Sequence, residues 1–124
     1  MSKPAKILCI DDEPDVLYAL QRFLGRQYDV TTESDPAKGL EMGLTGNYNL
    51  LILDLAMPGI SGMDIAAKLL KEKVHCRCIL LTAFADACAI QQVVNNPIIF
   101  HYSMKPWVDE SLLNTVVVAL ATLE

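Results

Sequence analysis

The sequence predicts an α/β domain in which helices cover both faces of a parallel β-sheet. Three observations lead to this fold class: five short apolar runs alternate with five helix-like stretches, their connections are short, and residues 50–53 are apolar without interruption. A strand that is apolar at every position is expected to be buried on both faces, which is typical of parallel sheets. Strict alternation of strand and helix favours the same layered architecture.

The first two strand–helix units each combine an apolar run with a proline near the helix start. Residues 5–10 form the first run, and Pro14 is well placed in the first turn of the next helix. The apolar face of that helix carries Leu17, Leu20, Phe23 and Leu24. Residues 28–32 form the second run, and Ser34-Asp35-Pro36 predicts a helix cap followed by proline. The second helix presents Ala37, Leu40 and Leu44 on one face.

The third unit has a buried strand and a clear helix-start signal. The apolar run 50–53 ends at Asp54, and the proline and glycines within 57–62 predict a loop. Ser61 and Asp64 have the spacing of a capping box, in which each side chain accepts from the other residue's backbone N–H. A helix is therefore predicted after this loop, with Ile65, Leu69 and Leu70 on its apolar face.

The last two units complete the alternation. Residues 78–81 form a fourth apolar run that is closed by Thr82, and Asp86 predicts the cap of another helix. The apolar residues of that helix are Ile90, Val93 and Val94, before Asn95-Asn96-Pro97 breaks it. Residues 98–102 form the fifth run. A final amphipathic helix is indicated by Leu113, Val116, Val117 and Leu120.

Length and composition predict one globular domain over residues 1–124, with its core in residues 5–123. The chain is 52% hydrophobic and 20% charged, a normal balance for one domain. It has neither an apolar run of roughly 20 residues nor the pattern of a signal peptide, so we expect a cytoplasmic protein without a membrane span. The net charge of −5, with no stripe of Lys and Arg, argues against direct nucleic-acid binding.

Cysteine and histidine residues give no sign of a metal site. The four cysteines, at positions 9, 76, 78 and 88, are expected to be reduced thiols in a cytoplasmic chain. Cys76 and Cys78 form a Cys-x-Cys pair, but no second pair has the spacing of a zinc site. His75 and His101 are expected to be surface or strand residues rather than phosphoryl donors.

Polar side chains follow four of the five predicted strands. Asp11 and Asp12 follow the first, Asp54 ends the third, Thr82 ends the fourth, and Lys105 lies just beyond the fifth. In an open α/β sheet, ligands bind outside the carboxyl ends of the strands. We therefore expect these side chains to meet at one edge of the sheet.

Three carboxylates at one place require a compensating cation. Two unit charges ~4 Å apart interact by about 4 kcal/mol at an effective dielectric constant near 20. Mg²⁺ prefers oxygen ligands and accepts one or two carboxylates together with water and phosphate oxygens. With Lys105 as a fixed positive charge and Thr82 as a hydroxyl donor, the group suits phosphoryl transfer to an Asp carboxylate.

Four short motifs resemble those of receiver domains of two-component response regulators, in the usual order. They are Ile10-Asp11-Asp12-Glu13-Pro14, Leu53-Asp54-Leu55-Ala56-Met57-Pro58-Gly59, Leu81-Thr82-Ala83 and Lys105-Pro106-Trp107. The resemblance extends from about residue 6 to the C-terminus. It implies the flavodoxin-like (βα)5 fold, a three-layer sandwich whose parallel strands lie in the order 2-1-3-4-5.

The resemblance also implies a role for each residue that would meet the phosphoryl group. Asp54 would be the phosphoacceptor, and Thr82 and Lys105 would contact the phosphoryl oxygens. The peptide bond before Pro106 would be cis, which would turn Lys105 inward. Such a domain catalyses its own phosphorylation and dephosphorylation and is not a turnover enzyme.

The Mg²⁺ site is implied by the same resemblance. Asp12 and Asp54 would coordinate the ion directly, and the backbone carbonyl of Ala56 would complete the protein ligands. Asp11 would act mainly through a metal-bound water.

Signalling would follow from a shift between two conformations. Thr82 would move toward the phosphoryl group and Tyr102 would turn inward, reshaping the face formed by the fourth helix, the fifth strand and the fifth helix. Tyr102 as an ordinary, partly buried tyrosine remains an open alternative. The implied partners are a sensor histidine kinase or phosphotransfer protein, a C-terminal output domain, and a second copy bound through that face.

Two apolar residues occupy positions that vary in the family. Ala56 and Phe84 lie two residues after the phosphoacceptor and the threonine, where polar side chains in relatives assist the hydrolytic water. We therefore expect slow spontaneous dephosphorylation. Arg77-x-Ile79-Leu80-Leu81-Thr82, Asn95 and Lys105-Pro106-Trp107 resemble a subclass often fused to HD-type phosphodiesterases of cyclic dinucleotides.

Three other functions remain open at this point. A haloacid-dehalogenase-like phosphatase also uses an aspartate nucleophile, but it places Asp-x-Asp after the first strand. A flavodoxin-like cofactor binder would offer Ser, Thr and Gly to a phosphate, where this chain has Asp11-Asp12-Glu13. A degenerate receiver would serve only as an interaction module, although the acidic and lysine motifs are intact.

Overall fold

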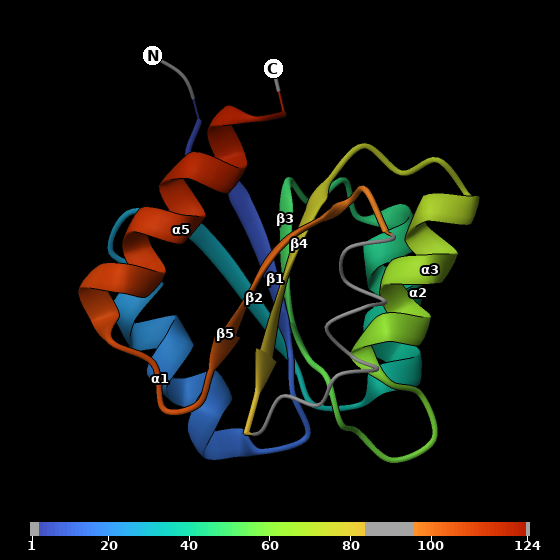
Figure 1. Cartoon of the computed structure of the whole chain (residues 1–124), viewed down its shortest axis with the longest axis horizontal. Helices are drawn as coiled ribbons and strands as arrows, with labels where there is room; N and C mark the ends of the chain where they lie inside the picture. Colours follow the sequence, from blue (N-terminus) through green and yellow to red (C-terminus); the bar gives the residue numbers. More distant parts are fainter. Residues whose placement is uncertain (1–2, 84–95, 124) are drawn as a thin grey trace.

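The computed structural model of the chain describes residues 3–83 and 96–123. Its parallel strands lie in the order β2-β1-β3-β4-β5 (Figure 1), so the predicted flavodoxin-like order is confirmed. The strands are β1 (Lys6–Ile10), β2 (Asp29–Glu33), β3 (Leu50–Asp54), β4 (Arg77–Thr82) and β5 (Ile99–Met104). The helices are α1 (Pro14–Leu24), α2 (Pro36–Thr45), α3 (Gly62–Lys71) and α5 (Asp109–Ala121). The helix predicted from Asp86 onward lies outside the described residues.

Helices cover both faces of the sheet, which gives three layers. α1 and α5 lie on one face, and α2 and α3 lie on the other (Figure 1). Alternate residues of a strand point to opposite faces, so Leu51 and Leu53 of β3 join one apolar cluster, and Leu50 and Ile52 join the other. All of β3 is buried, which is the burial that its unbroken apolar run predicted.

The helix starts follow local signals that were visible in the sequence. Asp35 is the N-cap of α2, and its side chain accepts a hydrogen bond from the Ala37 backbone N–H at 3.1 Å. Ser61 and Asp64 form the predicted capping box at the start of α3. Within residues 3–83 and 96–123, none of the helices combines the length and apolar character that a membrane span requires.

Three predicted helix faces were partly wrong. In α3, Ile65 and Leu69 are buried as predicted, but Leu70 is 37% exposed. In α5, Val116 is buried as predicted, but Val117 is 49% exposed and Ala119 is buried in its place. No residue of α5 after Ser111 is charged, so the apolar pattern alone did not define one face. In α2, Ala37 is exposed, and the helix meets the sheet through Gly39, where an added Cβ would lie 2.7 Å from Ile10 Cδ1.

Candidate functional site

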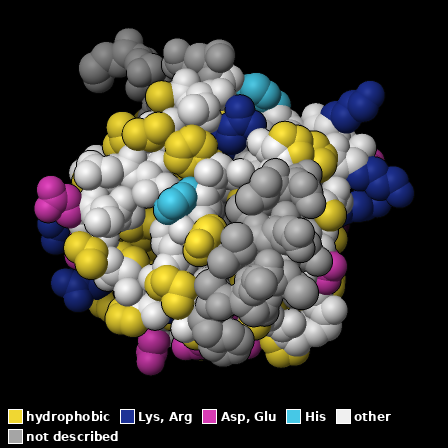
Figure 2. Space-filling model, viewed as in Figure 1, with side chains coloured by type: hydrophobic (Ala, Val, Ile, Leu, Met, Phe, Trp, Pro, Cys, Tyr) yellow, Lys and Arg dark blue, Asp and Glu magenta, His cyan; other side chains and the backbone are white. Residues whose placement is uncertain are grey.

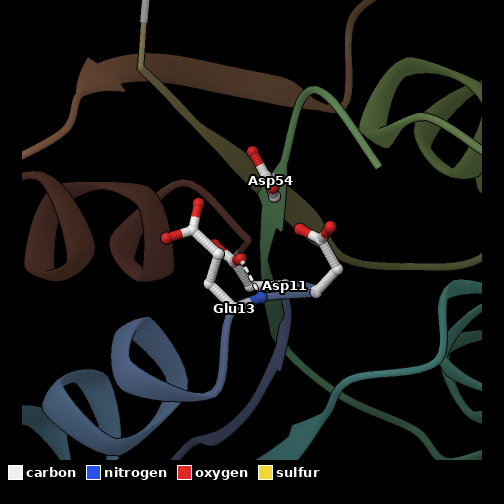
Figure 3. A group of neighbouring side chains, drawn as sticks. Asp11, Glu13 and Asp54 are labelled. Atoms are coloured by element: carbon white, nitrogen blue, oxygen red, sulfur yellow. Dashed lines mark hydrogen bonds between the residues drawn. The ribbon is translucent and has the colours of Figure 1, made fainter. Parts of the chain in front are cut away.

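The ends of β1 and β3 bring two buried carboxylates together. β1 and β3 are neighbours that pair Ile10 with Leu53, so Asp11 and Asp54 follow at the same level of the sheet. Asp11 is 1% exposed and Asp54 is 5% exposed. Figure 3 shows Asp11, Glu13 and Asp54 grouped at this edge. The predicted meeting of Asp11 with Asp54 is therefore what the structure shows.

Lys105 supplies the counterion for both carboxylates. Its Nζ atom lies 2.8 Å from Asp11 Oδ2 and 3.3 Å from Asp54 Oδ1. The Lys105 backbone N–H donates to the Thr82 carbonyl oxygen at 2.8 Å, which fixes the residue beside the end of β4. The peptide bond between Lys105 and Pro106 is cis, as the resemblance implied. The ammonium thus lies inside the acidic site, with its side chain 11% exposed.

The pKa values reflect the crowding of charge. Burial, and then the charge of Asp11, raises the pKa of Asp54 from 3.8 to about 6, against the opposing effect of Lys105. Burial alone would lower the pKa of Lys105, but its hydrogen bond and ion pair with Asp11, followed by those with Asp54, raise it overall. At neutral pH the site therefore holds an ammonium between carboxylates that repel each other.

Four carboxylates are close enough to hold one metal ion. Asp11, Asp12, Glu13 and Asp54 each offer an oxygen, and these oxygens all lie within 4.8 Å of one another. A donor set made only of carboxylate oxygens suits a hard divalent cation such as Mg²⁺. The sequence predicted three members of this group. Glu13 was missed, although its place beside two aspartates was a signal that the turn could fold it back.

The loop after β3 packs closely behind Asp54. The Ala56 backbone N–H is 3.4 Å from Asp54 Oδ1, and Ala56 itself is exposed. The first residue of α3 is Gly62, where an added Cβ would lie 2.4 Å from the Asp54 carbonyl oxygen. Glycine is thus required there because any side chain would push the helix away from Asp54. A metal-ligand role for the Ala56 carbonyl stays a prediction.

Thr82 and Tyr102 lie on the two strands nearest Lys105. Thr82 is buried at the end of β4, beside Met104 of β5. Tyr102 is half-buried, packs against the core cluster on the α2 and α3 face, and stacks on the His101 ring at a centroid distance of 5.8 Å. These positions suit the predicted switch, and the movement itself stays a prediction. Phe84 lies outside the described residues.

Comparison with known proteins decides the family. Residues 7–117 match the family described as the response regulator receiver domain. The chain belongs to this family. Receiver domains are signalling domains of two-component systems rather than turnover enzymes, so the phosphatase and the flavin binder are set aside.

Individual relatives agree with this assignment. The sequence is 29% identical to the hydrogenase transcriptional regulatory protein HoxA of Cupriavidus necator over 92% of this chain and 24% of that protein. It is 35% identical to the alkaline phosphatase synthesis regulator PhoP of Bacillus subtilis, over 63% of this chain and 33% of that protein. The receiver thus spans a third or less of the length of these two relatives.

Solved receiver structures share the whole fold. The signal receiver domain of an HD domain-containing protein from Pseudomonas fluorescens is 26% identical, with a TM-score of 0.90 and 98% of each chain covered. A response regulator receiver domain from Clostridium thermocellum is 30% identical, with a TM-score of 0.86 and 95% of each chain covered.

Proposed function

We propose that this receiver accepts a phosphoryl group from a histidine kinase or phosphotransfer protein on Asp54. The observation that carries the proposal is the Lys105 ammonium, 2.8 Å from Asp11 and 3.3 Å from Asp54, at the carboxyl ends of the strands. A cation held beside a buried carboxylate neutralises the charge that a transferring phosphoryl group brings. Relatives that regulate transcription are consistent with a signalling role.

The four-carboxylate group fits Mg²⁺, which would be held by Asp12, Asp54 and the Ala56 carbonyl, with Asp11 acting through a water. When bound, Mg²⁺ would neutralise the negative charge on the phosphoryl oxygens and orient the phosphoryl donor. The observation that supports this fit is the common reach of the four carboxylates, whose oxygens lie within 4.8 Å. Acidic groups so close together are expected to bind a divalent cation more readily than separate ones.

The chain's own residues account for the transfer. An Asp54 carboxylate oxygen forms a bond to phosphorus while the bond from phosphorus to the donor's imidazole nitrogen breaks, and that nitrogen keeps the electron pair and takes a proton from water. With a pKa of about 6, Asp54 is largely ionised, and therefore nucleophilic, at neutral pH. We propose that Lys105 and the Thr82 hydroxyl bind the phosphoryl oxygens.

The output surface is proposed to be the face of α4, β5 and α5, of which α4 lies outside the described residues. Thr82 and Tyr102 would link Asp54 to it. On the described part, Met104, Val108 and Val118 are exposed, and Figure 2 shows hydrophobic side chains over this region. An apolar surface suits a second copy of the chain or an output domain.

The wider arrangement is a proposal from relatives. We infer a single receiver domain over residues 1–124 that works in the cytoplasm, controls a partner protein or an output domain and does not itself bind nucleic acid. The structural neighbour from an HD domain-containing protein makes an HD-type output a specific candidate.

Phosphorylation of the whole chain tests the proposal. Wild type is incubated with acetyl phosphate or beryllium fluoride, with and without Mg²⁺, beside Asp54→Asn and the exposed control Asp29→Asn. With acetyl phosphate, we expect wild type and the exposed control Asp29→Asn to gain one phosphoryl group by intact mass only with Mg²⁺, and Asp54→Asn to gain none. Beryllium fluoride transfers no phosphoryl group, and we expect it to bind the same two proteins only with Mg²⁺, as measured by calorimetry. Wild type that responds to neither reagent would support the degenerate receiver instead.

The lifetime of the phosphoryl group tests the expectation from Ala56. An apolar, exposed Ala56 cannot orient the attacking water. Ala56→Asn is therefore expected to lose phosphate about tenfold faster than wild type, which is less than the ~10²–10⁴-fold of a positioned general acid or base because an amide orients the water without taking its proton. Release of phosphate after removal of the donor measures it. A shorter lifetime in wild type than in Ala56→Asn would end this idea.

A further inference from the structure

Glu13 occupies the N-cap of α1 without acting as a cap. Its backbone is extended, with φ −98° and ψ 111°, yet its side chain makes no capping hydrogen bond. At the same position of α2 and α3, Asp35 and Ser61 do cap their helices. Ser, Thr, Asp and Asn are the favoured residues there, so glutamate is a poor choice for starting a helix. Its side chain is therefore free to serve elsewhere.

The carboxylate of Glu13 lies over the phosphorylation site instead. Its Oε1 atom is 3.7 Å from Lys105 Nζ, and the side chain is 62% exposed, so it approaches the ammonium from the solvent side. The Glu13 backbone N–H donates to Asp11 Oδ1 at 2.9 Å, which folds the turn back toward the site (Figure 3). Among the described residues, Lys105 is thus contacted by three carboxylates, two of them buried and one exposed.

We propose that Glu13 is a positioning residue that holds the outer side of the Lys105 ammonium and adds a fourth negative charge to the site. This inference rests on the proposed function of the receiver. A negative charge attracts a divalent cation and repels an anionic phosphoryl donor. Glu13 therefore strengthens Mg²⁺ binding and weakens the binding of small anionic donors, and the two effects have opposite signs. If Glu13 served only to start α1, replacing it would change the affinity for Mg²⁺ and the affinity for the phosphoryl donor in the same direction.

The test compares wild type with Glu13→Gln, Glu13→Ser and Asp15→Asn. Glu13→Gln removes the charge and keeps the shape, whereas Glu13→Ser removes the charge but adds a favoured cap. Asp15 is an exposed acid in the first turn of α1 that is not among the four grouped carboxylates, so Asp15→Asn controls for net charge and for the helix dipole.

Three measurements separate the outcomes: the Mg²⁺ dissociation constant by calorimetry, the thermal midpoint without metal, and the acetyl phosphate concentration for half-maximal phosphorylation at saturating Mg²⁺. Because the charge is exposed, we expect both Glu13 variants to bind Mg²⁺ about threefold more weakly and to need about threefold less acetyl phosphate. Glu13→Ser should also raise the thermal midpoint. Asp15→Asn should change either constant by less than half as much.

The inference is overturned if both Glu13 variants match wild type, if both constants move in the same direction, or if Asp15→Asn has an equal effect. Wild type that binds no Mg²⁺ in calorimetry and takes up no phosphoryl group would overturn the proposed function itself. Wild type that does both, beside unchanged Glu13 variants, would overturn the role of Glu13 alone.

Discussion

Lys6 and Lys105 lie at opposite ends of the parallel strands, and their ammonium groups meet different partners. The N-terminal ends of the strands are called the amino edge here, and the C-terminal ends the carboxyl edge. Lys6 begins β1, and its Nζ donates to the Gly46 carbonyl oxygen at 2.8 Å. Lys105 follows β5, and its Nζ lies against the carboxylates of Asp11 and Asp54. The first lysine satisfies a neutral acceptor, whereas the second is the counterion of two buried charges.

The amino edge shows the same preference for neutral acceptors elsewhere. Arg77, at the start of β4, donates from Nε to Thr122 Oγ1 at 2.9 Å and from Nη2 to the Thr122 carbonyl oxygen at 3.2 Å. His75 lies 3.0 Å from the Leu123 carbonyl oxygen. These contacts hold the end of α5 and leave little interaction for a ligand to improve. At the carboxyl edge, repulsion between carboxylates remains, and a bound cation could relieve it.

Replacing each lysine in turn should give the largest difference between the edges. Lys105→Met leaves Asp11 and Asp54 buried without a counterion, so we expect it to lower the free energy of unfolding by about 2 to 3 kcal/mol at neutral pH without metal. Lys6→Met removes one hydrogen bond to a neutral oxygen and should lower it by about 1 kcal/mol. Urea unfolding of both variants measures the difference.

The effect of pH sharpens this result. As the pH falls to about 4, Asp54 becomes protonated, so the loss in Lys105→Met should shrink while that in Lys6→Met stays constant. If Lys105→Met lost the same free energy of unfolding at every pH, Lys105 would contribute packing rather than charge.

The raised pKa of Asp54 predicts a pH-dependent loss of stability of intermediate size. The folded-state pKa of about 6 exceeds the usual 3.8, so the folded protein binds more protons between these values, and its stability falls as the pH rises through them. Because water still screens part of the site, we expect a fall of about 1 to 2 kcal/mol. Asp54→Asn cannot ionise and should lose this part of the pH dependence, in urea unfolding with a chelator present.

Asp64→Asn provides the matched control for that measurement. Asp64 is an exposed carboxylate in the capping box of α3 and is not among the carboxylates that pair with Lys105. Asp64→Asn should therefore leave the fall in stability between about pH 4 and pH 6 in place. If Asp54→Asn retained the wild-type slope, the charge conflict would have to lie on other residues.

The difference between the edges also explains which parts of the molecule the sequence could predict. The order and direction of the strands fix which strand ends lie together. Once five parallel strands were recognised, Asp11, Asp54 and Lys105 were therefore expected at the same side of the sheet. Buried strands and helix caps follow local sequence patterns, and the capping box at Ser61 correctly predicted the start of α3. The contacts at the N-terminal ends of the strands left no such signal, because any residue offers a backbone carbonyl of the kind to which Lys6 donates.

The errors have physical causes of the same kind. Val117 was misplaced because α5 is apolar on most sides, and only packing decided that Ala119 faces the core. Gly39 was overlooked because a residue without a side chain adds nothing to an apolar pattern, yet it lets α2 approach Ile10. Glu13 was missed because its contact with Lys105 depends on how the turn after β1 folds.

Weakening the hydrogen bonds from Arg77 to Thr122, at the C-terminal end of α5, should have the smallest effect on stability. Arg77→Lys keeps a positive charge near the C-terminal end of α5, where a cation is favourable, but loses the fork that reaches both oxygens of Thr122. We expect about 0.5 kcal/mol of lost stability and faster amide hydrogen exchange confined to the last turn of α5. Arg22→Lys, on α1 beside the Tyr18 ring, is the control and should change neither. Faster exchange around Asp54 in Arg77→Lys would instead mean that the two edges are coupled, and the contrast between them would fail.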